Sequence, residues 1–137
     1  MTRSEIVRKA REYLGTPFHH QGRTKGRGVD CVGLVVCVLR ELGPEIDDCR
    51  TYPQTPDSGL LLNKLRQHLE EIPIDRAVSG DVYLMTIMGY PQHVAFLTDI
   101  GIIHTHQQVG RVVETGLDHA WRRRIVKAFT IAGISDE

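Results

Sequence analysis

The sequence lacks a long hydrophobic run and an apolar leader. No stretch approaches the roughly 18 consecutive apolar residues that a membrane-spanning helix requires. The first five residues, 1–5, also lack the apolar core of a secretory signal peptide. We therefore expect a protein without a membrane span, synthesised in the cytoplasm without a signal peptide.

Cysteine is scarce and the charges are balanced. The 17 Lys and Arg residues match 17 Asp and Glu residues, so the chain has no basic excess of the kind that binds nucleic acid. Its three cysteines are odd in number and irregularly spaced. This pattern argues against a disulfide framework and favours a reducing compartment.

The pattern of apolar residues predicts a single α+β domain over residues 1–137. Helical periodicity comes first, and alternating periodicity follows from Gly80 onward, which favours helices packed on an antiparallel sheet. Ser4 is expected to cap the first helix, and the glycine-rich segment 21–28 is expected to hold no regular structure. Helices are predicted over 4–14, 31–42 and 57–70, and strands over 82–87, 93–98, 102–106, 111–115 and 125–131.

The segment Asp30-Cys31-Val32-Gly33-Leu34 places a cysteine at the start of an apolar helix. Unsatisfied backbone N–H groups and the helix dipole favour a thiolate there, so we expect a lowered pKa and a nucleophilic Cys31. Asp30 is the expected N-cap, and Gly33 is expected to allow close packing of the helix. A lone cysteine is also often a small buried hydrophobe, which is how we interpret Cys37; Cys49 lies in a polar connection.

His93 begins a predicted strand and is the candidate base for Cys31. The turn after that strand decides which second histidine faces it. A turn at Thr98-Asp99 puts His104 opposite His93, whereas a turn at Asp99-Ile100 puts His106 there. In either register the second imidazole would orient His93 and fix its tautomer.

These motifs together resemble the NlpC-type cell-wall cysteine peptidases. The matching segments follow one another in the family's order: Gly15-Thr16-Pro17-Phe18, Gly28-Val29-Asp30-Cys31-Val32-Gly33-Leu34, Gly80-Asp81-Val82, His93-Val94-Ala95-Phe96 and Ile103-His104. The resemblance implies a papain-like fold and hydrolysis of peptidoglycan stem peptides, typically at the γ-D-glutamyl–diaminopimelate bond. It implies Cys31, His93 and His104 as catalytic residues, a thioester acyl-enzyme, and no cofactor.

One position departs from the family pattern. The family usually has a tyrosine before the cysteine, with its hydroxyl at the active site, and the aligned residue here is Phe18. A phenylalanine keeps the ring but loses the donor, so His19 or His20 is the candidate replacement. Together with Asp30 and the backbone N–H of Cys31, these residues form the expected oxyanion and substrate side of the site.

The chain resembles most the phage-encoded branch, found among tail-assembly and gene-transfer-agent proteins. That resemblance implies tail proteins as partners and incorporation into a tail particle. Three other interpretations stay open. They are another papain-like amidase or transpeptidase, a catalytically weak structural tail-tip module, and a zinc site. The zinc site is disfavoured because its ligands would be His19, His20, His104, His106 and Cys49, which do not form compact pairs.

Overall fold

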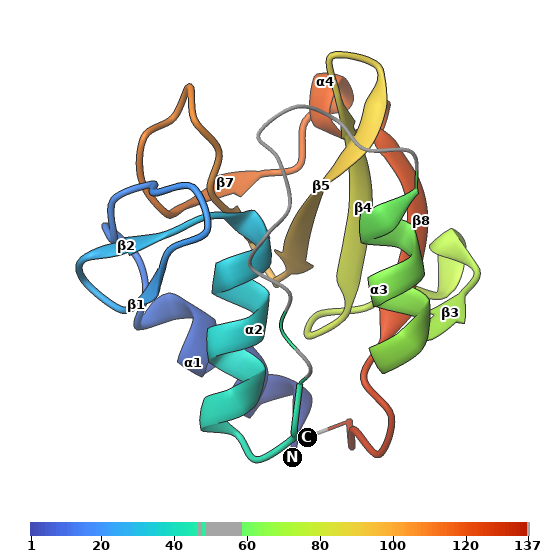
Figure 1. The fold of residues 1–137 in the computed structure, drawn as a ribbon. Coiled ribbons are helices and arrows are strands. Elements are labelled where there is room, and N and C mark those ends of the chain that lie inside the picture. Colours follow the sequence, from blue (N-terminus) through green and yellow to red (C-terminus); the bar gives the residue numbers. More distant parts are fainter. Residues whose placement is uncertain (47, 49–58, 137) are drawn as a thin grey trace.

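The computed structural model describes residues 1–46, 48 and 59–136. Helices and strands form an α+β fold, as predicted (Figure 1). The helices are α1 (Arg3–Arg11), α2 (Cys31–Glu41), α3 (Leu60–His68) and the short α4 (His119–Arg122), with a 3-10 turn at Ile74–Arg76. The six-stranded sheet has the order β3-β8-β4-β5-β6-β7, and all its neighbouring strands are antiparallel. Its strands are β3 (Glu70–Ile72), β4 (Val82–Ile87), β5 (Tyr90–Leu97), β6 (Gly101–His104), β7 (Val113–Gly116) and β8 (Ile125–Thr130).

The main core lies between the sheet and helices α1, α2 and α3, which share one side of it in Figure 1. Side chains alternate along a strand, so Val94 and Phe96 of β5 face this core. Leu34 and Val38 of α2 pack against them and are fully buried. A smaller cluster on the other face contains Ala95 and is partly covered by α4. The fold therefore sets the start of α2 beside the start of β5.

The first helix begins earlier than predicted. Its N-cap is Thr2 rather than Ser4, because the Thr2 hydroxyl accepts a hydrogen bond of 3.0 Å from the Glu5 N–H. The predicted second helix is confirmed as α2, with Leu42 as its C-cap. The predicted third helix corresponds to α3; its predicted first residues, 57 and 58, and Cys49 lie outside the described residues.

The expectation of no regular structure in segment 21–28 is wrong. Residues Arg23–Thr24 (β1) pair with Gly28–Val29 (β2) as a small antiparallel hairpin. Gly26 has a φ of +79° in the turn, which glycine adopts without strain, and its N–H donates to the hydroxyl of Thr16. The hairpin leads directly into Asp30 and thereby fixes where α2 begins.

The strand predictions are confirmed within a few residues, and β4 spans the predicted range. Strand β3 and helix α4 were not predicted, because both are too short to show a period. Within the described ranges, no helix is long and apolar enough to cross a membrane.

Candidate active site

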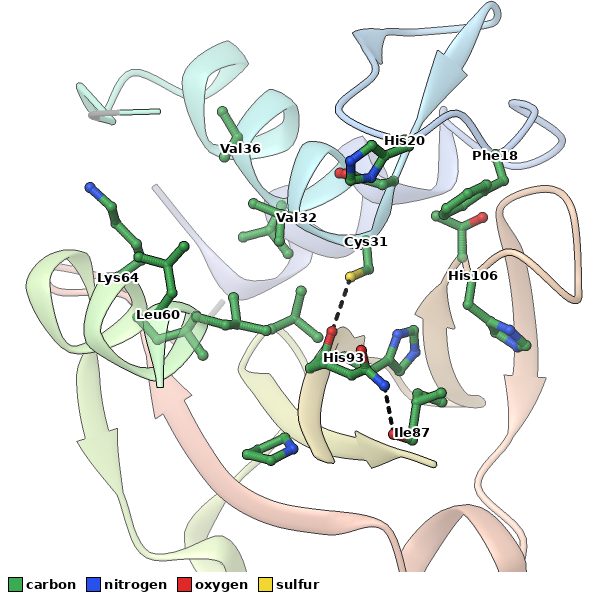
Figure 2. Close-up of a pocket in the computed structure, with 18 of the residues that line it drawn as sticks. Phe18, His20, Cys31, Val32, Val36, Leu60, Lys64, Ile87, His93 and His106 are labelled. Atoms are coloured by element: carbon green, nitrogen blue, oxygen red, sulfur yellow. Dashed lines mark hydrogen bonds between the residues drawn. The ribbon is translucent and has the colours of Figure 1, made fainter. Parts of the chain in front are cut away.

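Cys31 is the first residue of α2, and Asp30 determines that position. The Asp30 carboxylate accepts hydrogen bonds from the Gly33 N–H at 2.7 Å and from the Gln21 N–H at 2.8 Å. The predicted N-cap is therefore confirmed. Figure 2 shows the Cys31 side chain directed at the start of β5, where Sγ lies 3.9 Å from the Gln92 carbonyl oxygen.

His93 lies in β5 and is 1% exposed. Its Nε2 is 2.8 Å from Nδ1 of His104, which is also 1% exposed. No hydrogen bond joins the Cys31 thiol to the His93 ring in the part of the chain that the structure describes. The two residues do line the same pocket.

The strand register explains which histidine reaches His93. Phe96 pairs with Ile103, and the turn therefore falls at Asp99-Ile100. This register, continued, would put His106 directly opposite His93, but β6 ends at His104. His104 instead reaches His93 diagonally from its position opposite Ala95. The His106 ring stays 5.7 Å from the His93 ring, measured between centroids.

Trp121 of α4 covers the histidine cluster, a contact that the sequence did not reveal. Its ring centroid lies 4.7 Å from that of His104 and 6.0 Å from that of His93. The guanidinium of Arg124 stacks over the Trp121 ring, 4.6 Å from its centroid. The tryptophan shields the histidines, while the arginine places a positive charge nearby.

The electrostatics of the site differ from the sequence prediction. Burial raises the pKa of the Cys31 thiol to about 12, and the Asp30 charge adds to this effect. Backbone hydrogen bonds from Val94 of β5, and from Val32 and Cys31 at the helix start, lower the pKa, but by less. Burial also lowers the pKa of His93 well below its usual range. Both directions favour a neutral pair of Cys31 thiol and His93 imidazole in the unliganded protein, opposite to the lowered thiol pKa that the helix start alone leads us to expect.

The pocket beside Cys31 has a volume of about 480 Å³ and is mostly apolar. Phe18 and His20 line it near Cys31, whereas His19 does not; His19 is exposed, with its Nδ1 bonded to the His20 carbonyl. His19 is thus placed away from the site. The aliphatic part of the lining comes from α2 and α3 and includes Val32, Val35, Val36, Leu39, Leu61 and Leu65.

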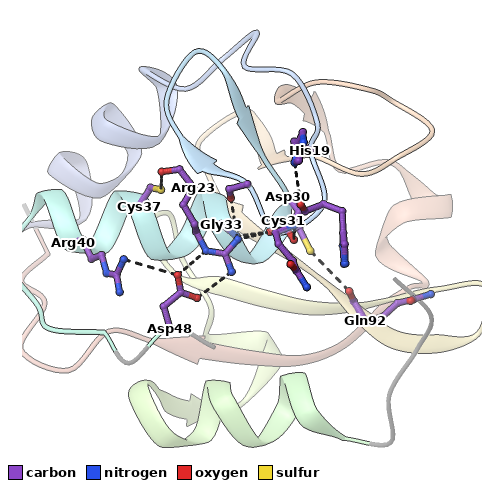
Figure 3. Close-up of polar contacts among 12 residues, drawn as sticks. His19, Arg23, Asp30, Cys31, Gly33, Cys37, Arg40, Asp48 and Gln92 are labelled. Atoms are coloured by element: carbon purple, nitrogen blue, oxygen red, sulfur yellow. Dashed lines mark hydrogen bonds and ion pairs between the residues drawn. The ribbon is translucent and has the colours of Figure 1, made fainter. Parts of the chain in front are cut away.

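A buried ion-pair network supports the start of α2 (Figure 3). Arg23 donates to both carboxylate oxygens of Asp48, at 2.7 and 3.0 Å, and to Asp30 at 3.1 Å. The side chains of all three residues are less than 10% exposed. Arg23, in the glycine-rich segment 21–28, is therefore held by buried carboxylates rather than exposed to solvent. Sequence alone could not show it, since Asp48 lies 25 residues away.

The buried histidines give the stability of the fold a pH dependence. Burial, with the neighbouring His106, lowers the pKa of His104 from 6.5 to about 4. Below pH 6.5 the unfolded chain therefore binds a proton that the folded chain does not. We expect the free energy of unfolding, measured in urea, to be highest above pH 7, and the His104 contribution alone to lower it by about 2 kcal/mol by pH 5. A His104→Gln variant should lose much of this slope, and an unchanged slope would contradict the assignment.

No group of three or more His, Cys, Asp or Glu side chains among the described residues could hold a metal ion. His104 and His106 are neighbours, but no further ligand joins them there.

The fold and the pocket define the class of protein first. It is an α+β domain with helices packed on an antiparallel sheet, with Cys31 at a helix start and His93 on a strand beside it. The comparison with family models then gives the family. The model described as NlpC/P60 family matches residues 15–130, and the chain therefore belongs to that family.

Solved structures of NlpC/P60 proteins share the fold. The NlpC/p60 domain of the peptidoglycan hydrolase SagA has a TM-score of 0.70 at 22% identity, covering 96% of this chain and 100% of that domain. An NlpC/P60 family protein from Bacillus cereus has a TM-score of 0.71 at 20% identity, covering 93% of this chain and 39% of that protein. RipD from Mycobacterium tuberculosis, described as non-catalytic and adapted to peptidoglycan binding, has a TM-score of 0.63 at 13% identity, covering 95% of this chain and 96% of that one. The search of curated proteins finds no match.

Proposed function

We propose that this chain is a cysteine hydrolase that cleaves an amide bond in peptidoglycan stem peptides. The observation that carries the proposal is the shared pocket of Cys31 and His93, with His104 bonded to the far side of the His93 ring. Membership of the NlpC/P60 family, whose structural neighbours include peptidoglycan hydrolases, supports the substrate class.

The neutral pair implies how the reaction would begin. As Cys31 Sγ attacks the amide carbonyl, Nδ1 of His93 takes the thiol proton, so that no free thiolate needs to form in the apolar pocket. The S–C bond forms, the C–N bond breaks, and His93 passes the proton to the leaving amine. Water, deprotonated by His93, then hydrolyses the thioester. The backbone N–H of Cys31 lies in the first turn of α2, where N–H groups have no helical partner, and would stabilise the oxyanion.

The resemblance to the family favours the γ-D-glutamyl–diaminopimelate bond. The test is digestion of purified stem peptides under reducing conditions, with products identified by mass spectrometry and a Cys31→Ala variant run in parallel. Cleavage after the γ-D-glutamyl residue by the wild type alone would support both the reaction and the bond. An intact substrate, with folded wild-type protein, would reject the proposed hydrolysis of free stem peptides.

Phe18→Tyr is expected to raise activity about three-fold to ten-fold. Phe18 lines the pocket, so a tyrosine there would add a hydroxyl donor near the reacting carbonyl, and a single donor of this kind can contribute more than that. The measurement is kcat/KM on the stem peptide for both proteins. Unchanged kcat/KM would mean that residue 18 does not occupy the position of the family tyrosine.

The aliphatic lining favours a second candidate, an amidase or transpeptidase whose acyl group is apolar. The same digestion separates the two, because an enzyme of this kind would leave stem peptides intact and would cleave acyl amides with aliphatic chains. A Cys31→Ala variant would again serve as the control.

We further propose that the protein acts within a phage or gene-transfer-agent tail particle, bound to tail proteins. The support is the resemblance to that branch. Particles assembled with the Cys31→Ala protein separate the two roles of such a component. Normal assembly with lost wall degradation would indicate an enzyme, whereas wall degradation that persists would indicate a structural tail-tip module.

A further inference from the structure

Two buried ring nitrogens near His93 have no hydrogen-bond partner among residues 1–46, 48 and 59–136. They are Nε2 of His104 and Nε2 of His106. The two ring centroids are 5.7 Å apart, and the rings are tilted by 34°. Trp121 packs against both, with its centroid 4.7 and 5.9 Å from theirs. A buried polar atom without a hydrogen-bond partner lowers the stability of the fold, so we expect each of these two nitrogens to have a partner.

A third buried polar atom without a partner among the described residues lies on the face of the sheet that carries His104. It is Oγ1 of Thr115. In the β6–β7 ladder His104 pairs with Val113 and Ile102 pairs with Thr115, so Thr115 lies diagonally from His104 on the same face. A buried water typically has two to four polar partners, and the two ring nitrogens supply the lower number. Thr115 lies on the side of His104 away from His106.

The proposed function fixes where the protons must lie, and the inference rests on it. If Nδ1 of His93 accepts the thiol proton, then Nε2 of His93 carries a hydrogen and donates it to Nδ1 of His104, 2.8 Å away. His104 must then carry its own proton on Nε2. That N–H group is one of the two buried atoms without a partner.

We infer that a buried water molecule joins Nε2 of His104 to Nε2 of His106, and that His106 is thereby a positioning residue for His93. The water accepts from His104 and donates to His106, which carries its proton on Nδ1. This arrangement holds His104 in the tautomer whose Nδ1 is an acceptor. Without it, His104 can carry its proton on Nδ1 and donate to His93, which leaves the proton of His93 on the wrong nitrogen.

The charge states of His93, His104 and His106 agree with these tautomers. Burial lowers the pKa of His93, His104 and His106, so each ring is neutral near pH 7 and carries one proton. The Arg124 guanidinium acts in the same direction on His93 and His106. Trp121 packs against all three rings and shields them from bulk water, with the Arg124 guanidinium over its own ring.

The test compares His106→Gln with His106→Met. Gln and Met have the same length, but only Gln offers an acceptor at the position of Nε2. The readout is the rate of Cys31 alkylation by iodoacetamide, followed peptide by peptide with mass spectrometry, which needs no physiological substrate. We expect His106→Met to react about ten-fold more slowly than the wild type, and His106→Gln to recover most of the rate.

A second measurement reads the tautomers directly. Long-range ¹H–¹⁵N spectra of the wild-type imidazoles should show the proton of His104 on Nε2 and that of His106 on Nδ1. The opposite tautomer of His104, or equal alkylation of Cys31 in the wild type and a folded His106→Met variant, would overturn the inference. Alkylation that follows the expected order in a protein that leaves stem peptides intact would support the inference and reject only the proposed substrate.

Discussion

Cys31→Ser is expected to reduce stem-peptide hydrolysis by at least about 10⁴-fold, since loss of a catalytic nucleophile typically costs that much or more. The serine hydroxyl is a much weaker acid than the thiol. The His93 imidazole, whose pKa is lowered by burial, is too weak a base to take its proton readily. The substitution changes one atom in a half-buried side chain, so the thermal midpoint should stay within a few degrees. The measurements are kcat/KM and a thermal melt.

The matched control is the same substitution at a second cysteine. Cys37 lies on α2 as well, but its Sγ contacts the Arg23 carbonyl oxygen at 3.3 Å and it does not line the pocket. Cys37→Ser should therefore keep nearly full activity. If Cys31→Ser retained more than about a tenth of the wild-type rate, Cys31 would not be the nucleophile.

Local sequence was sufficient to predict where the candidate nucleophile lies. The Asp30 cap and the apolar run after Cys31 are contiguous, and the structure begins α2 at Cys31. The choice between His104 and His106 could not be made in the same way. It depends on the turn between β5 and β6 and on where β6 ends, and the Thr98-Asp99-Ile100-Gly101 segment was compatible with either turn.

The contacts within the site that sequence reasoning missed are long-range. Trp121 joins the histidine cluster from α4, and Arg23 is buried by a carboxylate 25 residues away. The rise in the Cys31 pKa has the same origin, because α3 and β5 join α2 in forming the pocket that buries the thiol. A helix N-terminus can be recognised from neighbouring residues, whereas the burial that outweighs it is a property of the folded chain.

Gly33→Ala is expected to destabilise the fold by about 3 kcal/mol or more, although alanine is the better helix former by about 1 kcal/mol. A Cβ at this position would lie 2.1 Å from the Gly22 carbonyl oxygen and 2.8 Å from Nη1 of Arg23. Neither atom can move away at low free-energy cost. The Gly22 oxygen belongs to the backbone, and the Arg23 guanidinium is held between buried Asp30 and Asp48. Overpacking therefore outweighs helix propensity. Urea unfolding measures the change.

Gly116→Ala is the matched control, because a Cβ there meets nothing within 4 Å. Its stability should stay within about 0.5 kcal/mol of the wild type. The Gly33 variant should also lose activity under conditions where it remains folded, since any shift of the hairpin against α2 moves the Asp30 cap and Cys31 with it. A Gly33→Ala protein as stable and as active as the wild type would show that the hairpin can move away from α2 with little loss of stability. Gly33 would then not be the residue that sets the distance between the hairpin and the candidate nucleophile.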